Sequence, residues 1–249
     1  MIKSFLGEVG KYLIMLKEMF SKPENAKLYW KEFLTQCSEI GVGALGIVCI
    51  ISIFIGAVST VQTAYQLVSP LIPPSTIAMV VRDTVILEFS STLVCIVLAG
   101  VIGSKIASEL GNMRVSEQID ALEIMGINTK TYLVLPKIVA SMIMIPMLVV
   151  LAMFLGILGG RIAGVASGIL SGETFDRGLM ENFVPFNITF ALIKSYVFAF
   201  IISSISAYHG YYVKGGSLEI GKSSTKSVIV SCVMVLLADY MLAAVLLSK

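Results

Sequence analysis

Stretches without a charged residue recur along the chain, and their lengths predict how often it crosses a membrane. A membrane-spanning helix needs about 20 predominantly apolar residues. The stretch from Gly41 to Val81 carries no charge, and three prolines between Pro70 and Pro74 end a first span within it. A further uncharged stretch runs from Ile138 to Gly160. Both are long enough to hold a span.

Three other stretches reach that length only if each holds one charged residue inside the membrane. These residues are Glu88, Lys194 and Asp239. The sequence therefore predicts five spans, at about 42–68, 84–104, 138–160, 188–208 and 227–247.

Apolar residues also recur at helical spacing before the first span. They are Phe5, Val9, Tyr12, Leu13, Leu16, Met19 and Phe20, with Lys3, Lys11 and Lys17 between them. This pattern is typical of an amphipathic helix lying in the membrane interface, and a helix packed on a soluble partner is the alternative. Acidic residues interrupt the apolar core that a signal peptide would need. We therefore interpret residues 1–40 as an interfacial segment and residues 41–249 as the five-span domain.

Composition supports this division. Hydrophobic residues make up 57% of the 249 residues and charged residues 14%, whereas soluble domains have about 45–50% and 25%. The expected fold is an all-α integral membrane protein. A net charge of +2 without a basic stripe gives no indication of a nucleic-acid partner.

The distribution of basic residues predicts the orientation, because cytoplasmic segments are enriched in lysine and arginine. The richer side holds Lys3, Lys11, Lys17, Lys22, Lys27, Lys31, Lys105, Arg114, Lys130, Lys137, Lys214, Lys222 and Lys226. The other side holds Arg82, Arg161, Arg177 and Lys249. The N-terminus is therefore expected in the cytoplasm and the C-terminus in the periplasm.

The charged residues inside the spans are expected at similar depths. Each costs about 2.5–3.5 kcal/mol at the bilayer centre unless it has a partner or a water-filled surrounding. We expect Lys194 and Asp239, on consecutive helices, to form a structural pair. Glu88 either lines a polar cavity or is a hydrogen-bonded core acid.

Glycines recur every four residues at the outer end of the third span, at Gly156, Gly160, Gly164 and Gly168. Small residues on one helical face allow two helices to approach closely in a membrane. The partner of this stripe lies either within the chain or in a second copy.

The segment Gly216–Ser223 matches the GxxxxGK[ST] pattern of nucleotide-binding loops. Such a loop requires a preceding strand and a following helix in a parallel-sheet domain, and there is no room for this unit between two spans. We interpret the segment as a turn whose lysines face lipid headgroups. Neither the single histidine, His209, nor the four cysteines show metal-ligand spacing, so no metal site is expected.

Residues 108–126 form the most informative segment, between the second and third spans. Val115, Ile119, Leu122 and Gly126 fall on one helical face, with acidic residues largely elsewhere. A short amphipathic helix in this position suits the docking of a soluble partner.

This segment, with the run GSKIASELGNMRV followed by EQIDALEIMG, resembles the signature of the MlaE-type permeases. These proteins are the membrane subunits of ABC transporters that maintain lipid asymmetry. The run YYVKGGSLEIGKSSTKSVIVSCVMVLLADYML is similar to the last loop and span of the same family. The sequence departs from the family pattern near Glu88, where Leu87 and Val101 replace basic residues.

The resemblance implies a non-catalytic permease subunit in the bacterial inner membrane that moves phospholipid. The implied partners are a second copy of the chain, a cytoplasmic ATPase that binds the ATP, and a periplasmic MCE-domain lipid carrier. No cofactor would bind the chain directly. The residues expected to couple to the ATPase are Glu109, Arg114, Glu117, Gln118, Asp120, Leu122 and Glu123, and Glu88 would line the lipid cavity.

Two other classes of function are alternatives. A membrane-embedded lipid-modifying enzyme would need a nucleophile with a base, or a metal centre, at membrane depth, and the sequence shows neither. A passive channel or scaffold would not need the amphipathic docking segment.

Overall fold

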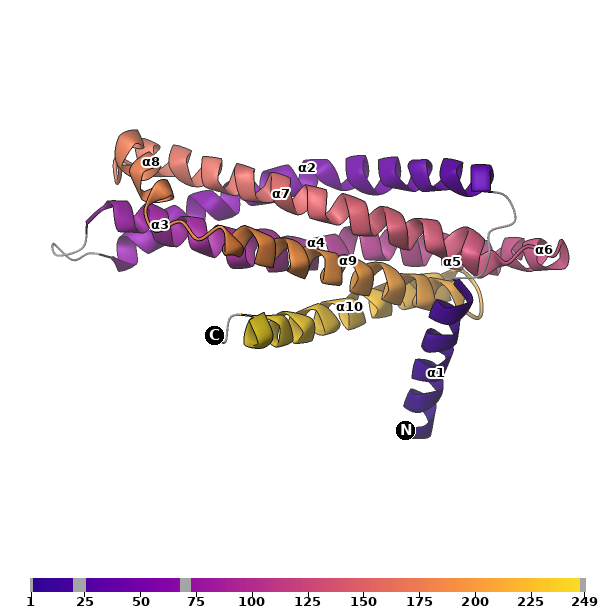
Figure 1. Cartoon of the computed structure of the whole chain (residues 1–249). Coiled ribbons are helices and arrows are strands. Elements are labelled where there is room, and N and C mark those ends of the chain that lie inside the picture. The colour runs from indigo at the N-terminus through magenta and orange to yellow at the C-terminus, as the bar shows by residue number, and fades with distance from the viewer. Residues whose placement is uncertain (1, 20–25, 68–72, 247–249) are drawn as a thin grey trace. The chain divides into compact units, whose positions relative to one another are not determined.

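The computed structural model of the chain consists of helices joined by short connections (Figure 1). It describes residues 2–19, 26–67 and 73–246, and no strand occurs in these ranges. The α-helices are α1 (Ile2–Met19), α2 (Ala26–Gln66), α3 (Ser75–Thr84), α4 (Val94–Leu98), α5 (Ser104–Val115), α6 (Gln118–Ile124), α7 (Leu135–Ala166), α8 (Gly172–Met180), α9 (Phe186–Tyr211) and α10 (Ser217–Leu246).

Within these ranges, five helical stretches are long and apolar enough to cross a membrane, which confirms the expected all-α fold with an additional N-terminal helix. They are Tyr29–Gln66, Ser75–Val115, Lys130–Ala166, Phe186–Tyr211 and Ser217–Leu246. Each is longer than the span that the sequence predicted for it. Helical hydrogen bonding continues into polar residues with adequate helix propensity, whereas hydropathy marks only the apolar part.

The second of these stretches is not a uniform α-helix. It alternates α-helical pieces with two π-helical segments, η1 (Val85–Leu93) and η2 (Ala99–Gly103). A third π-helical segment, η3 (Lys130–Val134), precedes α7. Such segments are rare and are frequently found at functional sites. Glu88 lies within η1.

The described chain divides into two compact units, each assembled from separate segments. Unit 1 comprises residues 1–43, 98–144 and 198–238, and unit 2 comprises residues 44–97, 145–197 and 239–249. The long helices α2, α7, α9 and α10 contribute residues to both.

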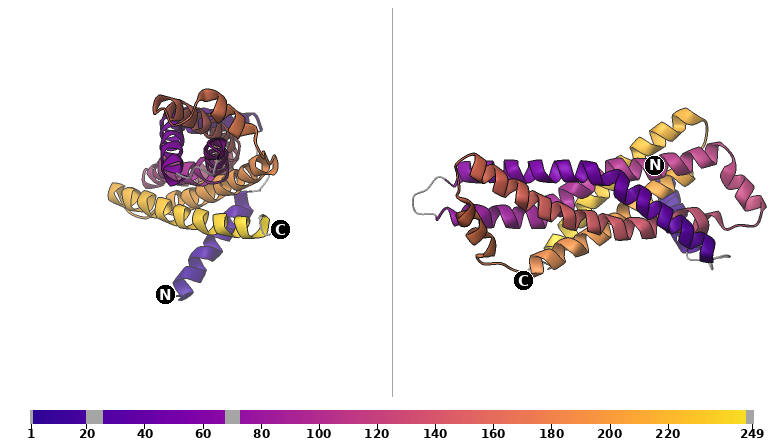
Figure 2. Two further views of the ribbon diagram at one scale, coloured as in Figure 1. Left: turned by 90° about the vertical axis from the view of Figure 1, so that its left-hand side faces the viewer. Right: turned by 90° about the horizontal axis from the view of Figure 1, so that it is seen from above.

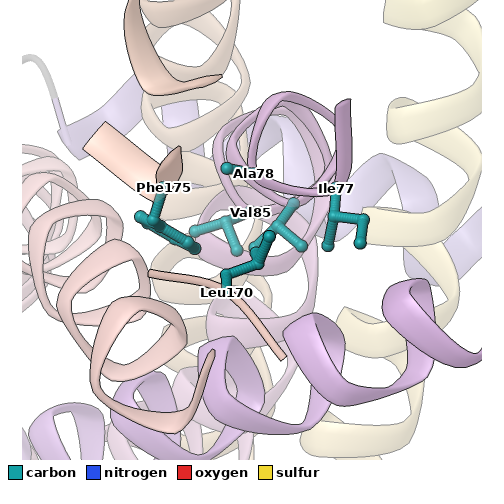
Figure 3. Packing of buried hydrophobic residues seen from close by; sticks show 6 residues of the cluster. Ile77, Ala78, Val85, Leu170 and Phe175 are labelled. Atoms are coloured by element: carbon teal, nitrogen blue, oxygen red, sulfur yellow. The ribbon is translucent and has the colours of Figure 1, made fainter. Parts of the chain in front are cut away.

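In unit 2, α8 packs on α3 (Figure 3). The buried cluster consists of Ile77, Ala78, Val81, Val85, Leu170 and Phe175. A glycine permits the close contact, because a Cβ atom at Gly178 would lie 2.2 Å from the Ser75 carbonyl oxygen. The buried Arg82 guanidinium secures the same region by donating hydrogen bonds to the carbonyls of Leu179 (2.7 Å) and Glu181 (2.8 Å).

The glycine stripe of α7 packs on η1 and on α2 within this chain. A Cβ atom at Gly156 would lie 2.9 Å from Val85 Cγ1, and at Gly160 it would lie 2.6 Å from Thr60 Oγ1. Gly164 lies against the same threonine. Gly168, which the sequence placed in the stripe, instead has φ +69° and open space around it, so it ends the helix.

Two glycines outside the predicted stripe bring the backbones of α2 and α7 still closer together. A Cβ atom at Gly56 would lie 1.8 Å from the Gly156 carbonyl oxygen, and one at Gly159 would lie 2.2 Å from the Ile53 carbonyl oxygen. Both clashes involve backbone atoms, which cannot rotate away. Figure 2 shows these parts of α2 and α7 side by side.

We expect Gly56→Ala to lower the free energy of unfolding by about 1–3 kcal/mol, the usual cost of overpacking, because α2 and α7 must move apart to admit the added methyl group. Gly46→Ala on the same helix is the matched control, since nothing lies within 4 Å of its added Cβ atom. Thermal unfolding of the detergent-purified variants measures the difference. Equal melting temperatures for both variants would contradict the close contact.

In unit 1, α1 is anchored to α9 and η3. The hydroxyls of Tyr12 and Ser204 form a 2.8 Å hydrogen bond, and Met15 and Met19 are buried. Burial raises the pKa of Tyr12 above its usual value, so its phenol stays protonated. The segment predicted over residues 1–40 holds α1 and also the start of α2, because α2 begins at Ala26.

Candidate coupling surface and intramembrane charge cluster

Three charged side chains meet around Lys194 in unit 2. The lysine lies on α9 and is fully buried, and its Nζ lies 2.5 Å from Asp239 Oδ1 on α10 and 3.2 Å from Glu88 Oε1 on η1. Nζ also donates a 2.9 Å hydrogen bond to the Leu87 carbonyl. A buried lysine requires such compensation, since an isolated ammonium in an apolar interior is strongly unfavourable.

The two carboxylates differ in exposure. The side chain of Asp239 is 17% exposed and that of Glu88 is 49% exposed. Glu88 also accepts a 3.1 Å hydrogen bond from Thr92. One cation and two carboxylates leave the cluster with a formal negative charge, on the side where Glu88 is accessible.

The sequence suggested a Lys194–Asp239 pair with Glu88 apart from it, and the structure brings all three together. The Leu87 position also takes part, through its carbonyl rather than its side chain. The side chains that form ion pairs with Lys194 are both carboxylates, an arrangement that suits charge compensation.

The segment between the second and third long helices belongs to unit 1 and forms two helices, not the single helix predicted over 108–126. Helix α5 ends at Val115, and α6 begins at Gln118. Glu117 between them has φ +60°, a left-handed conformation that a continuous helix cannot contain. The turn lets Ile119 become fully buried while Arg114 forms a 2.6 Å ion pair with Asp120.

Several residues predicted to couple to a partner are engaged within the chain. Glu109 forms a 2.6 Å ion pair with the buried Lys137. Glu123 accepts hydrogen bonds from Tyr211 (2.8 Å) and Thr129 (3.1 Å). Together with the Arg114–Asp120 pair, these contacts hold α5 and α6 in place.

The remaining predicted residues face outward to different extents. Glu117 and Gln118 are exposed, and Leu122 is half-buried. The structure adds two apolar residues that the sequence analysis missed, Ile124 (88% exposed) and Met125 (66% exposed). In the sequence, these residues could have been recognised as two adjacent apolar residues at the end of α6 that do not share the helical face of the buried Ile119.

The nucleotide-loop pattern at Gly216–Ser223 lies mostly inside a helix. Helix α10 begins at Ser217, so most backbone amides of the segment lie in its first turns rather than around a phosphate-sized loop. Lys222 forms a 2.6 Å ion pair with Glu219. No strand precedes the segment in the described part of the chain, and the pattern is therefore not a nucleotide-binding loop.

The described residues contain no group of three or more histidine, cysteine or acidic side chains that could hold a metal ion. The four cysteines are free thiols, and Cys95 is fully buried.

Comparison with known proteins gives one consistent result. The profile of the family described as Permease MlaE matches residues 33–245. A probable ABC transporter permease protein of Rickettsia bellii is 33% identical over 94% of this chain and 90% of its own length. The chloroplastic Protein TRIGALACTOSYLDIACYLGLYCEROL 1 of Arabidopsis thaliana is 33% identical over 88% of this chain and 63% of its own length.

The intermembrane phospholipid transport system permease protein MlaE of Haemophilus influenzae is 26% identical over 99% of this chain and 98% of its own length. The region matched by the family profile contains the charge cluster, the α5–α6 segment and nearly all of the five long apolar helices. This chain is a multi-pass membrane protein that belongs to the MlaE permease family.

Proposed function

We propose that this chain is the membrane subunit of an ATP-driven transporter that moves phospholipid. Its family and the transport functions of its relatives support this assignment. The chain is proposed to have no catalytic activity of its own. A separate ATPase subunit binds and hydrolyses the ATP, and the permease converts its motion into movement of lipid.

The observation that carries the proposal is the exposed apolar end of α6. Ile124 and Met125 are large, apolar and exposed on a short helix between two membrane-spanning stretches. Adjacent exposed apolar residues that are surrounded by polar ones mark protein–protein contact sites. Ion pairs and hydrogen bonds from Arg114 and Glu123 fix this end in place, as a surface that transmits force requires.

The Lys194 cluster supports the lipid part of the proposal. Charged residues inside membrane proteins commonly mark transport pathways. Glu88 is the accessible member, and we propose that it lines the lipid cavity. Lys194 and Asp239 hold it in position.

The remaining assembly follows from the same assignment. The chain acts as a dimer with a second copy of itself in the bacterial inner membrane. A periplasmic MCE-domain protein exchanges phospholipid with the pair of permeases.

Reconstitution with the ATPase subunit in phospholipid nanodiscs tests this function. We expect ATP hydrolysis that the permease stimulates, together with ATP-dependent transfer of a fluorescent phospholipid to acceptor vesicles. Lipid transfer that proceeds at the same rate without ATP would instead indicate a passive channel. Chemical change of the lipid would indicate an enzyme.

The proposed orientation, with a cytoplasmic N-terminus, makes a separate prediction. In a variant lacking the native cysteines, a cysteine replacing the exposed Glu173 should react with a membrane-impermeant maleimide added from the periplasmic side. A cysteine replacing the exposed Gln118 should react only after the membrane is opened. Labelling in the reverse order would overturn the orientation and the cytoplasmic placement of α6.

A further inference from the structure

A cavity of about 250 Å³ lies in unit 1, lined by residues of α1, of the end of α9 and of the start of α10. Figure 1 shows α1 passing the junction between α9 and α10. The cavity contains none of the residues assigned above to lipid transport or ATPase docking. It is lined by Glu8, Tyr208, His209, Tyr212, Val213, Lys214, Glu219, Lys222, Ser223 and Lys226. Three lysines therefore converge on one small space.

The lysines are only partly neutralised. Lys222 forms its 2.6 Å ion pair with Glu219, but Lys226 lies 3.9 Å from Glu8, at the limit of an ion pair. Lys214 has no hydrogen-bond or ion-pair partner among the described residues. Three ammonium groups against two carboxylates leave the cavity with a surplus of positive charge.

Aromatic residues complete the wall. The rings of Tyr208 and Tyr212 lie 5.1 Å apart, and the Tyr12 ring of α1 packs edge-on against Tyr208 at 5.8 Å. Gly215, with φ +116°, forms the turn that brings Lys214 across from the first residues of α10. The turn thus gathers lysines from both sides of the α9–α10 junction around tyrosine side chains that offer hydrogen-bond donors.

We propose that this cavity binds the phosphate group of a phosphate ester. Lysine ammonium groups bind phosphate as point charges, and several of them around one space suit a group with several acceptor oxygens. The cavity lies where two apolar helices end, which is the depth of lipid headgroups. The ester comes either from an anionic phospholipid of the same membrane or from a soluble phosphate compound.

This site would bind phosphate in a different way from a nucleotide-binding loop. The lysine side chains that line the cavity, not the backbone amides of Gly216–Ser223, would contact the anion. Glu219 and Glu8 lie next to Lys222 and Lys226, so a phosphate group would compete with these carboxylates for the lysine ammonium groups. Removing one of these carboxylates should therefore strengthen binding.

The test uses the full-length chain in detergent and native mass spectrometry of added phosphatidylglycerol. The double variant Lys214→Gln/Lys226→Gln should bind this lipid at least about tenfold more weakly than the parent. The matched control Lys17→Gln/Lys31→Gln removes two exposed lysines outside the cavity and should bind within about twofold of the parent. Glu8→Gln should bind more tightly.

Competition with inorganic phosphate and glycerol 3-phosphate distinguishes the sources. Failure of both to displace the lipid, together with weaker lipid binding by the lysine double variant, identifies a headgroup site. Binding of the soluble phosphate compounds with the same dependence on Lys214 and Lys226 identifies a soluble phosphate ligand, and either result supports the phosphate site.

Two results would overturn the proposal. One is equal affinity of the double variant and its control for phosphatidylglycerol, with no binding of the soluble esters. The other is weaker binding by Glu8→Gln, which would make the cavity a structural charge network. Neither result depends on whether the chain transports lipid, so the proposed function is tested separately.

Discussion

The Lys194→Met variant should be poorly assembled, because it removes the only cation that contacts Glu88 and Asp239 in the described chain. Asp239 is then left nearly buried as an uncompensated carboxylate beside a second one. Breaking a buried ion pair by removing one partner typically costs about 3–5 kcal/mol in soluble proteins. Size-exclusion profiles and melting temperatures of the detergent-purified chain measure the effect.

Asp239→Leu should be milder than Lys194→Met. The lysine that remains still has Glu88 at 3.2 Å and the Leu87 carbonyl at 2.9 Å. Its ammonium is therefore compensated in part. Glu88→Gln keeps the size and hydrogen bonding of the side chain, so it should preserve assembly while changing lipid transfer.

The double variant Lys194→Met/Asp239→Leu should be more stable than Lys194→Met alone, because it removes the stranded charge together with its partner. Lys105→Met is the matched control, since it breaks an exposed 3.0 Å ion pair with Glu39 that should contribute no more than about 1 kcal/mol. A double variant as unstable as Lys194→Met would show that the two residues do not compensate each other. Loss of assembly in Glu88→Gln would place Glu88 in the structural core instead of the lipid cavity.

The number and type of long helices were predictable because the bilayer imposes a minimum apolar length. This constraint acts on each segment separately, so it needs no knowledge of neighbours. The amphipathic N-terminal helix was predictable from the helical spacing of its apolar residues, although the residue at which it ends was not. Residues from Ala26 onward belong to α2, and the spacing of apolar residues alone does not show where α1 ends and α2 begins.

The arrangement around Lys194 was only partly predictable. Similar depths along three helices indicated that the charges are able to meet, but which of them do meet depends on how each helix is rotated. The π-helical segment η1 changes that rotation near Glu88, and no local sequence rule reveals it. Contact between Glu88 and Lys194 therefore required the structure.

The glycine contacts show a similar limit. The stripe on α7 was visible because its members share one spacing, whereas Gly56 on α2 is isolated in the sequence. Its importance arises from the Gly156 carbonyl that faces it. A contact between two helices depends on the residues of both, so a pattern on one helix does not show which residues of the other helix it contacts.

The docking segment shows where periodicity misleads. A continuous helix over 108–126 would place Val115, Ile119 and Leu122 on one face, but the left-handed Glu117 interrupts that register. Ile119 is buried in unit 1 and Leu122 is half-buried, whereas Ile124 and Met125 face outward. The exposed apolar surface therefore lies at the end of α6 and not on the face that the helical periodicity predicts.

This geometry changes which variants best test ATPase coupling. Leu122 is half-buried, so Leu122→Asp combines a folding effect with a docking effect. Ile124 is almost fully exposed, and substitutions at exposed positions usually change stability by less than about 0.5 kcal/mol. Ile124→Asp should therefore leave the permease folded and inserted.

The same variant should uncouple the ATPase. An apolar anchor at the centre of an interface typically contributes about 2 kcal/mol or more, equivalent to roughly 30-fold in affinity. We expect Ile124→Asp to abolish most co-purification of the ATPase and most lipid-stimulated ATP hydrolysis. Glu117→Lys, at the exposed start of α6, should weaken both measurements less.

Leu218→Asp provides the matched control, because Leu218 is also large, apolar and exposed but lies at the start of α10. It should co-purify with the ATPase as the parent does. If Ile124→Asp and Glu117→Lys both retain the parent's co-purification and ATP hydrolysis, the ATPase does not dock on α6. The exposed apolar end of that helix would then need another partner, and the observation that carries the proposed function would be lost.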